Sequence, residues 1–141
     1  MISFFTEDIK FELDYQVEID NWLNEAITHE RKQIEEINYI FCSDSYLLEI
    51  NQKYLQHDYY TDIITFPYSY NPIKSDIYVS IDRIRDNART NHCDDTIELY
   101  RVIIHGLLHM MGYDDTTEQA QQLMTQKENF YLNLISWVRK K

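Results

Sequence analysis

Glycine and proline are scarce in this chain of 141 residues, which contains two of each. Flexible linkers and domain boundaries are rich in such residues, and no stretch of that kind interrupts the sequence. Internal repeats and low-complexity segments are absent as well. We therefore expect residues 1–141 to form one domain, long enough to bury a single hydrophobic core.

Cysteine is equally scarce, with Cys42 and Cys93 far apart in the sequence and no C-x-x-C unit. A disulfide framework is therefore not expected. The first eight residues turn acidic and carry no signal-peptide pattern, so we expect a reducing, cytoplasmic environment. Long apolar runs are missing too. The longest uncharged stretch around the histidines, Val102 to Tyr113, is too short to cross a bilayer, and no membrane partner is expected.

Basic residues are outnumbered, with 13 lysines and arginines against 24 acidic residues and a formal net charge of −11. Broad non-specific binding to nucleic acid needs a basic surface, so no DNA partner is expected. The acidic net charge does not exclude a local strip of basic residues on the surface. Arg101 lies four residues before His105, on the same helix face, and a guanidinium there could hold a phosphate. Salt bridges to the many acidic residues are the alternative.

Both glycines fall in one segment, His105 to Asp115, which has the pattern H-x-x-x-H-x-x-G-x-x-D. Two histidines four apart on a helix lie on one face and suit a divalent metal such as zinc. Gly112 is the residue type that ends a helix in a left-handed cap. Asp115 follows three residues later, and the pattern therefore predicts a metal site formed by His105, His109 and Asp115.

The metzincin peptidases share this skeleton, but they place a catalytic glutamate directly after the first histidine. Gly106 occupies that position here. A glycine inside a helix costs about 1 kcal/mol relative to alanine. We expect either close approach by a substrate or another backbone, or tight helix packing, to compensate for this cost.

Hydrophobic periodicity predicts an α+β domain in which one four-stranded mixed sheet packs with about five helices. The histidines lie on a long apolar helix similar to the metal helix of zincins. The expected strands cover residues 2–5, 34–42, 62–68 and 76–80. The expected helices cover residues 17 to near 31, 44–54, 81–91, 96–111 and 118 to about 138.

Three segments resemble the YbeY family of metal-dependent bacterial endoribonucleases. The segment from His105 to Asp115 resembles the signature H-G-x-L-H-L-x-G-Y-D-H. Residues 51–66 are similar to N-x-x-Y-R-x-x-D-x-x-T-D-V-L-S-F, and residues 76–80 are similar to the strand G-D-I-x-I-S. The order and spacing of the segments fit along nearly the whole chain.

The resemblance implies a single-strand-specific endoribonuclease that acts in 16S rRNA 3′-end maturation and ribosome quality control. It further implies one zinc ion per chain, although other divalent metals are possible. Ribosomal RNA, the ribosome or its small subunit, and ribosome-associated proteins are the implied partners. The catalytic residues that the resemblance implies are His105, His109 and Asp115. We add Arg101 as a candidate catalytic residue because its helix spacing places it beside the metal ligands.

The chain departs from the family at two positions. Asp115 replaces the third metal histidine, and a carboxylate is an acceptable zinc ligand that also suits iron or manganese. Leu55 replaces an arginine that acts at the family's active site, and Arg101 or His57 could take its place. Two alternatives therefore stay open, a non-catalytic ribosome-associated metal-binding factor and a zinc hydrolase of another substrate.

Two further roles are open at this point. Asp114 could cap the turn that ends the metal helix, or it could accept a hydrogen bond from a ligand histidine. The 12 tyrosines could supply stacking platforms for unpaired bases, or they could be half-buried residues of the sheet and helices.

Overall fold

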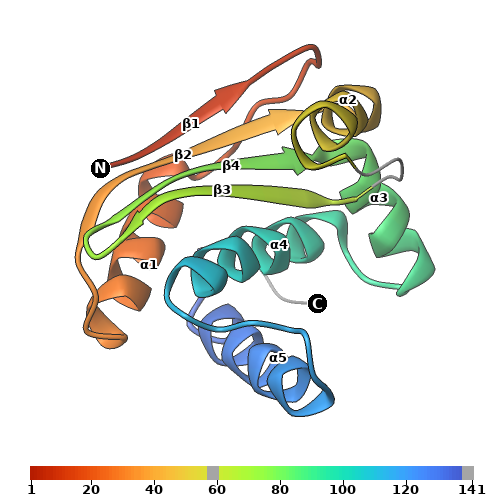
Figure 1. The fold of residues 1–141 in the computed structure, drawn as a ribbon. Helices are drawn as coiled ribbons and strands as arrows, with labels where there is room; N and C mark the ends of the chain where they lie inside the picture. The colour runs from red at the N-terminus through yellow and green to blue at the C-terminus, as the bar shows by residue number, and fades with distance from the viewer. Residues whose placement is uncertain (57–60, 138–141) are drawn as a thin grey trace.

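One mixed sheet organises the computed structural model, which describes residues 1–56 and 61–137 (Figure 1). Its strands are β1 (Ile2–Thr6), β2 (Ile34–Cys42), β3 (Ile63–Tyr70) and β4 (Ile73–Ser80), in the order β1-β2-β4-β3. The pairs β1–β2 and β2–β4 are parallel, whereas β3 runs antiparallel to β4. The α+β class and the mixed four-stranded sheet expected from the sequence are confirmed.

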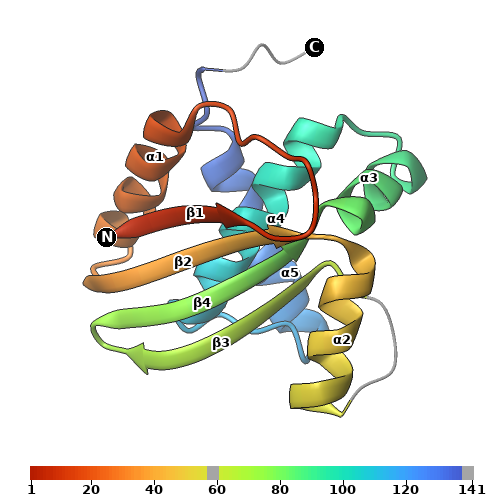
Figure 2. The ribbon, with the colours of Figure 1, turned by 90° about the horizontal axis from the view of Figure 1, so that it is seen from above.

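The five helices cover the two faces of the sheet unequally. They are α1 (Gln16–His29), α2 (Asp44–Leu55), α3 (Ile81–Thr90), α4 (Asp95–Met110) and α5 (Glu118–Leu132). Helices α1 and α4 pack beneath the sheet and α5 lies below α4, whereas α2 lies on the opposite face at one end of the sheet (Figures 1 and 2). The other face therefore stays partly open beside α2.

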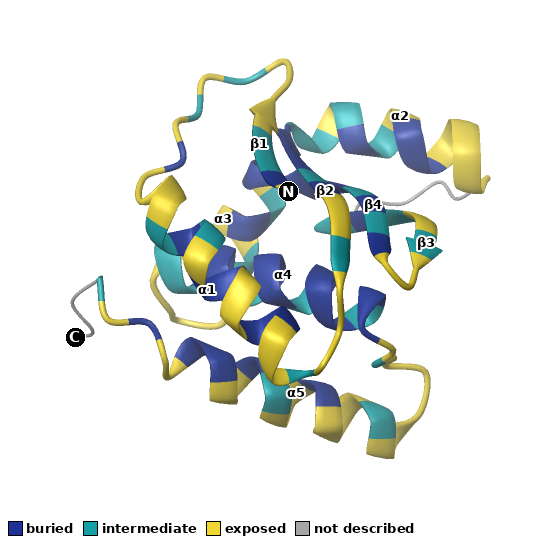
Figure 3. Cartoon of the chain, turned by 90° about the vertical axis from the view of Figure 1, so that its left-hand side faces the viewer, coloured by how far each residue is buried: buried dark blue, intermediate teal, exposed yellow. Residues whose placement is uncertain are grey.

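The main hydrophobic core lies between the sheet and the layer of α1, α4 and α5. Helix α4 is buried along most of its length, while α5 exposes its outer side (Figure 3). The alternating strand β2 contributes Ile37, Tyr39 and Phe41 to this core. The hydroxyl of Tyr39 donates a hydrogen bond to the Ile103 carbonyl at 2.9 Å, which ties the sheet to α4.

Polar side chains cap the N-termini of α2 and α4. Ser43 caps α2 by accepting a hydrogen bond from the Tyr46 amide, and Asp94 caps α4 by accepting one from the Thr96 amide. Helix α4 therefore begins at a defined residue, which sets the positions of the two histidines further along it. Within the described ranges, no helix is both long and apolar enough to cross a membrane.

Three boundaries differ from the sequence-based expectation. Strand β3 was expected to end at residue 68, just after Pro67, but it continues to Tyr70. It can do so because β3 is an edge strand, where a proline removes no required hydrogen bond. The pairing with β4 shifts register between Pro67 and Ser69. Strand β4 begins at Ile73, three residues earlier than expected. Helix α5 ends at Leu132, and the expected end near residue 138 falls outside the described residues.

Candidate metal centre

Helix α4 places His105 and His109 side by side. Their rings lie 4.6 Å apart between centroids, and their Nε2 atoms are 3.0 Å apart. Both side chains are partly exposed, at 22% for His105 and 30% for His109. The helix thus presents two imidazole nitrogens together at its surface, as the i, i+4 spacing predicts.

The turn after α4 brings Asp115 back to the histidines. Gly112 adopts φ +102°, a conformation that residues with a side chain rarely adopt. Asp115 Oδ2 then lies 3.6 Å from His105 Nε2 and 3.7 Å from His109 Nε2. The structure therefore brings together all three ligands expected from the sequence.

The spacing of these donor atoms fits one divalent ion. Zinc holds nitrogen and oxygen ligands at about 2.0–2.2 Å, so that donors in a tetrahedral shell lie about 3.4 Å apart. The three distances here are 3.0, 3.6 and 3.7 Å. We refer to His105, His109 and Asp115 as the metal cluster.

A buried glutamate, which sequence reasoning missed, orients the first histidine. His105 Nδ1 donates a hydrogen bond to Glu128 Oε2 at 2.6 Å, and the Glu128 side chain is only 8% exposed. This bond orients the ring so that its Nε2 atom points toward His109 and Asp115. Carboxylates commonly support metal-binding histidines in this way. A signal existed in the sequence, because Glu128 lies one turn after Met124 on the buried face of α5.

Arg101 contacts the cluster through this glutamate. Its Nη1 donates to Glu128 Oε1 at 2.9 Å, and its Nη2 donates to the Asn129 side chain at 2.9 Å. The salt-bridge alternative weighed for Arg101 is therefore the one seen in the structure. The guanidinium holds Glu128, which in turn holds His105.

The surroundings of the two histidines shift their pKa values in opposite directions. Burial by itself lowers the pKa of His105, but the hydrogen bond and charge of Glu128, with Asp115 and Asp62, raise that pKa above its ordinary value. Burial and the neighbouring charge of His105 lower the pKa of His109. This shift favours the neutral form of His109, which is the form that binds metal ions.

Asp62, at the start of β3, is a further acidic group near the cluster. Burial raises the pKa of its carboxyl above the ordinary value, and the charge of His105 opposes this shift. Asn87 on α3 donates a hydrogen bond to Asp62 Oδ2 at 3.3 Å. The sequence alone gave no role for this residue.

Gly106 allows α4 to pack closely on the sheet. A Cβ atom at this position would lie 2.8 Å from Ile63 Cδ1 and 3.2 Å from Ile77 Cγ2. Of the two explanations considered for this glycine, tight packing is the one seen. The position that carries a glutamate in metzincins therefore faces the hydrophobic interior here.

Two other expected residues have different outcomes. Asp114 Oδ1 accepts hydrogen bonds from the Thr116 amide and hydroxyl, both at 3.3 Å, so Asp114 stabilises the turn. Leu55 is 40% exposed at the end of α2 and adds no charge there. His57, which could replace the missing arginine, lies outside the described residues.

A groove of about 470 Å³ opens beside the cluster. Strand β3 forms one wall with Ile63, Thr65 and Pro67, and the region around His109 and Gly112 forms the other. The metal cluster therefore borders a surface groove in which an extended substrate could lie.

Glu30 anchors the loop between α4 and α5, which carries Asp115. Tyr113, two residues before Asp115, donates a hydrogen bond to Glu30 Oε1 at 2.6 Å. Tyr131 and Lys127 donate to Glu30 Oε2. Burial acts to raise the pKa of Glu30, but these hydrogen bonds and the lysine charge lower it to about 2.

This anchor makes stability depend on pH. Because the pKa of Glu30 is lower in the folded protein than its ordinary 4.5, its contribution is present above about pH 4.5 and is lost as pH falls toward 2. We expect Glu30→Gln to lower the free energy of unfolding by roughly 2 kcal/mol at pH 7. Urea titrations should show that the difference in unfolding free energy between the variant and the parent becomes smaller from pH 5 to pH 3.

The matched control is Glu25→Gln, which changes an exposed glutamate on α1, the helix that ends directly before Glu30. We expect this control to stay within about 0.5 kcal/mol of the parent throughout. If the difference in unfolding free energy between Glu30→Gln and the parent stays constant from pH 5 to pH 3, the ionised Glu30 carboxylate does not stabilise this loop.

Comparison with known proteins identifies close relatives. The sequence model of the family described as "Endoribonuclease YbeY" matches residues 1–136. A relative of that name from Cytophaga hutchinsonii is 49% identical over 135 residues, covering 94% of each chain. Another from Flavobacterium psychrophilum is also 49% identical over 135 residues, covering 95% of this chain and 96% of the relative.

A solved structure shares the fold of this chain. The solution structure of TM1509 from Thermotoga maritima superimposes with a TM-score of 0.72 at 28% sequence identity. The match covers 94% of this chain and 87% of that one.

Proposed function

The chain belongs to the endoribonuclease YbeY family and is thus a nuclease acting on RNA, and we propose that it cleaves single-stranded RNA with a divalent ion held by His105, His109 and Asp115. We propose zinc as that ion, one per chain, because its preferred ligands and distances match the donor set. An acidic ligand also admits iron or manganese.

The spacing of the metal cluster carries this proposal. Three donor atoms from a helix and the following loop lie within one coordination shell of each other. Two imidazoles and a carboxylate would hold a divalent ion with three protein ligands, the number found in catalytic zinc sites. The adjoining groove would give an RNA strand access to that ion.

The side chains around this cluster have different roles. Glu128 accepts the Nδ1 proton of His105 in a hydrogen bond, which would leave the Nε2 lone pair available to a metal ion. Arg101 holds Glu128 in place through an ion pair of 2.9 Å, so we propose that its part in catalysis is to position these groups. A bound divalent ion supplies polarisation of the phosphodiester and activation of water.

The biological substrate that we propose is the precursor 3′ end of 16S ribosomal RNA in the cytoplasm. The proposed partners are the small ribosomal subunit and ribosome-associated proteins, with a part in ribosome quality control. Family membership supports this assignment. The charge of −11 adds a physical reason, because an acidic protein gains from a partner that delivers it to RNA.

Elemental analysis of the purified protein tests the metal cluster. We expect about one equivalent of zinc in the parent and a reduction of at least tenfold in affinity for zinc in Asp115→Ala, because one of three protein ligands is removed. The matched control is Asp114→Asn, which removes the adjacent charge but keeps the oxygen that accepts from Thr116.

Either of two results would count against the proposed ligand set. One is a parent that takes up no divalent metal after reconstitution. The other is an Asp115→Ala variant with the affinity of the parent. Loss of metal only in Asp115→Ala, with Asp114→Asn unchanged, would support the assignment of Asp115.

A further inference from the structure

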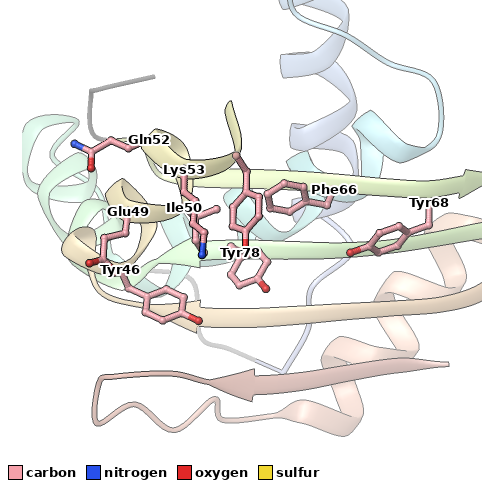
Figure 4. A pocket seen from close by; sticks show the side chains of 9 residues that line it. Tyr46, Glu49, Ile50, Gln52, Lys53, Phe66, Tyr68 and Tyr78 are labelled. Atoms are coloured by element: carbon pink, nitrogen blue, oxygen red, sulfur yellow. The ribbon is translucent and has the colours of Figure 1, made fainter. Parts of the chain in front are cut away.

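A second groove lies on the face of the sheet opposite α4. It has a volume of about 850 Å³ and is bounded by α2 and the hairpin of β3 and β4 (Figure 4). We refer to it as the aromatic groove because five rings line it. These rings belong to Tyr46, Tyr54, Phe66, Tyr68 and Tyr78.

We propose that the aromatic groove binds unpaired bases of the same RNA strand that is cleaved at the metal cluster. The inference rests on the proposed function, since it assumes an RNA substrate longer than the nucleotides next to the cleaved bond. It adds a binding site on another face of the protein, formed by other residues.

Strand β3 connects the two sites. Side chains alternate across a strand, so Ile63, Thr65 and Pro67 line the groove beside the metal cluster. Phe66 and Tyr68 line the aromatic groove instead. Because β3 is the edge strand of the sheet, an RNA strand can pass around it from one groove to the other.

The rings are exposed and held in place, which suits stacking. Tyr54 and Tyr68 are 62% and 61% exposed. The Tyr68 hydroxyl donates to Asp76 at 2.8 Å, and the Tyr54 ring packs edge-on against Phe66 with centroids 6.0 Å apart. Rings that are already positioned lose little freedom on binding, and every base has a face that stacks on them.

Beneath these two side chains the remaining rings form a continuous aromatic floor. Phe66 meets Tyr78 edge-on at 5.8 Å between centroids, and Tyr46 stacks on Tyr78 at 6.4 Å. Figure 4 shows Tyr46, Tyr78, Phe66 and Tyr68 following one another along the groove. A series of this kind offers contacts to several successive bases.

Among the residues that line the aromatic groove the ionic side chains are Glu49 and Lys53, whose charges cancel, whereas the whole chain carries −11. The Lys53 ammonium lies 5.4 Å from the centroid of the Tyr54 ring. This cation beside an exposed ring can face a phosphate, while Asp76 and Glu7 place negative charge near Tyr78 on the other side of the groove.

Fluorescence anisotropy with a labelled 20-nucleotide oligoadenylate tests the proposal. EDTA keeps the strand intact and makes binding independent of the metal. We expect Tyr54→Ala and Tyr68→Ala each to weaken binding about tenfold, as expected for the loss of one stacked base. Tyr54→Phe, which keeps the ring, should bind like the parent, and an abasic strand of equal length should bind at least about tenfold more weakly.

Phe5→Ala is the matched control. Phe5 is 51% exposed and pairs in register with Ile40, which pairs with Tyr78, so it lies on the same face of the sheet at the opposite edge. We expect its affinity for the oligonucleotide to equal that of the parent. Circular dichroism establishes that each variant is folded.

The outcomes separate this inference from the proposed function. Unchanged binding in both tyrosine variants, or equal affinity for the abasic strand, would overturn the inference and leave the rings as a surface for a protein partner. A parent that binds the strand through these tyrosines but never cleaves RNA with metal present would overturn the proposed function alone. In a cleaving parent, the tyrosine variants should raise KM for the long strand and leave kcat unchanged.

Discussion

Replacing His109 with alanine is expected to slow RNA cleavage at least about a thousandfold while the domain stays folded. Metal-ion catalysis contributes several kcal/mol to the transition state, and each 1.36 kcal/mol is a tenfold change in rate. The variant keeps only one histidine and Asp115 as ligands. Because the His109 side chain is 30% exposed, little packing is lost with it.

Single-turnover cleavage of a labelled single-stranded RNA, at saturating zinc, measures this effect. His92→Asn is the matched control, since His92 is exposed, lies away from the cluster in sequence and has φ 55°, which asparagine tolerates. We expect the control to cleave at the rate of the parent. Cleavage by His109→Ala at the rate of the parent would refute metal-dependent catalysis at this cluster.

The second large effect is expected at Gly106. Gly106→Glu should lower the free energy of unfolding by about 4 kcal/mol and the melting temperature by more than about 10 °C. A Cβ atom there already approaches Ile63 and Ile77, so the longer side chain would carry a carboxylate into the hydrophobic interior. Thermal denaturation followed by circular dichroism measures the change.

Gly106→Ala adds only the Cβ atom, so it separates the effect of that atom from the effect of the longer, charged glutamate side chain. The nearest atom, Ile63 Cδ1, ends a flexible side chain that can yield, and alanine gains about 1 kcal/mol of helix propensity. We therefore expect Gly106→Ala to lie within about 1 kcal/mol of the parent. A stable Gly106→Glu protein that cleaves peptides would instead reopen the hydrolase alternative.

Local patterns in the sequence predicted most of the secondary structure. The alternation of apolar residues in β2 predicted its bounds at residues 34 and 42, because this signal acts within a few residues. The extent of β3 past Pro67 depended on its place at the edge of the sheet, which is a tertiary property. The early start of β4 likewise depends on pairing with β2 and β3.

The metal cluster was predictable for the same reason, since its three residues lie within eleven positions of one helix and turn. The groups that support it were not. Glu128 lies 23 residues from His105, and Glu30 lies 83 residues from Tyr113. Contacts of this kind are visible only after α1, α4 and α5 have packed together.

The division of the cluster between a helix and a loop bears on how such a protein evolves. His105 is tied to Glu128 and Arg101, so a change there disturbs several groups at once. Asp115 follows a glycine turn and the anchored Tyr113, and it is exposed. The donor at position 115 can therefore be replaced with little disturbance of its surroundings, and such a replacement would change the charge and the preferred ion of the site.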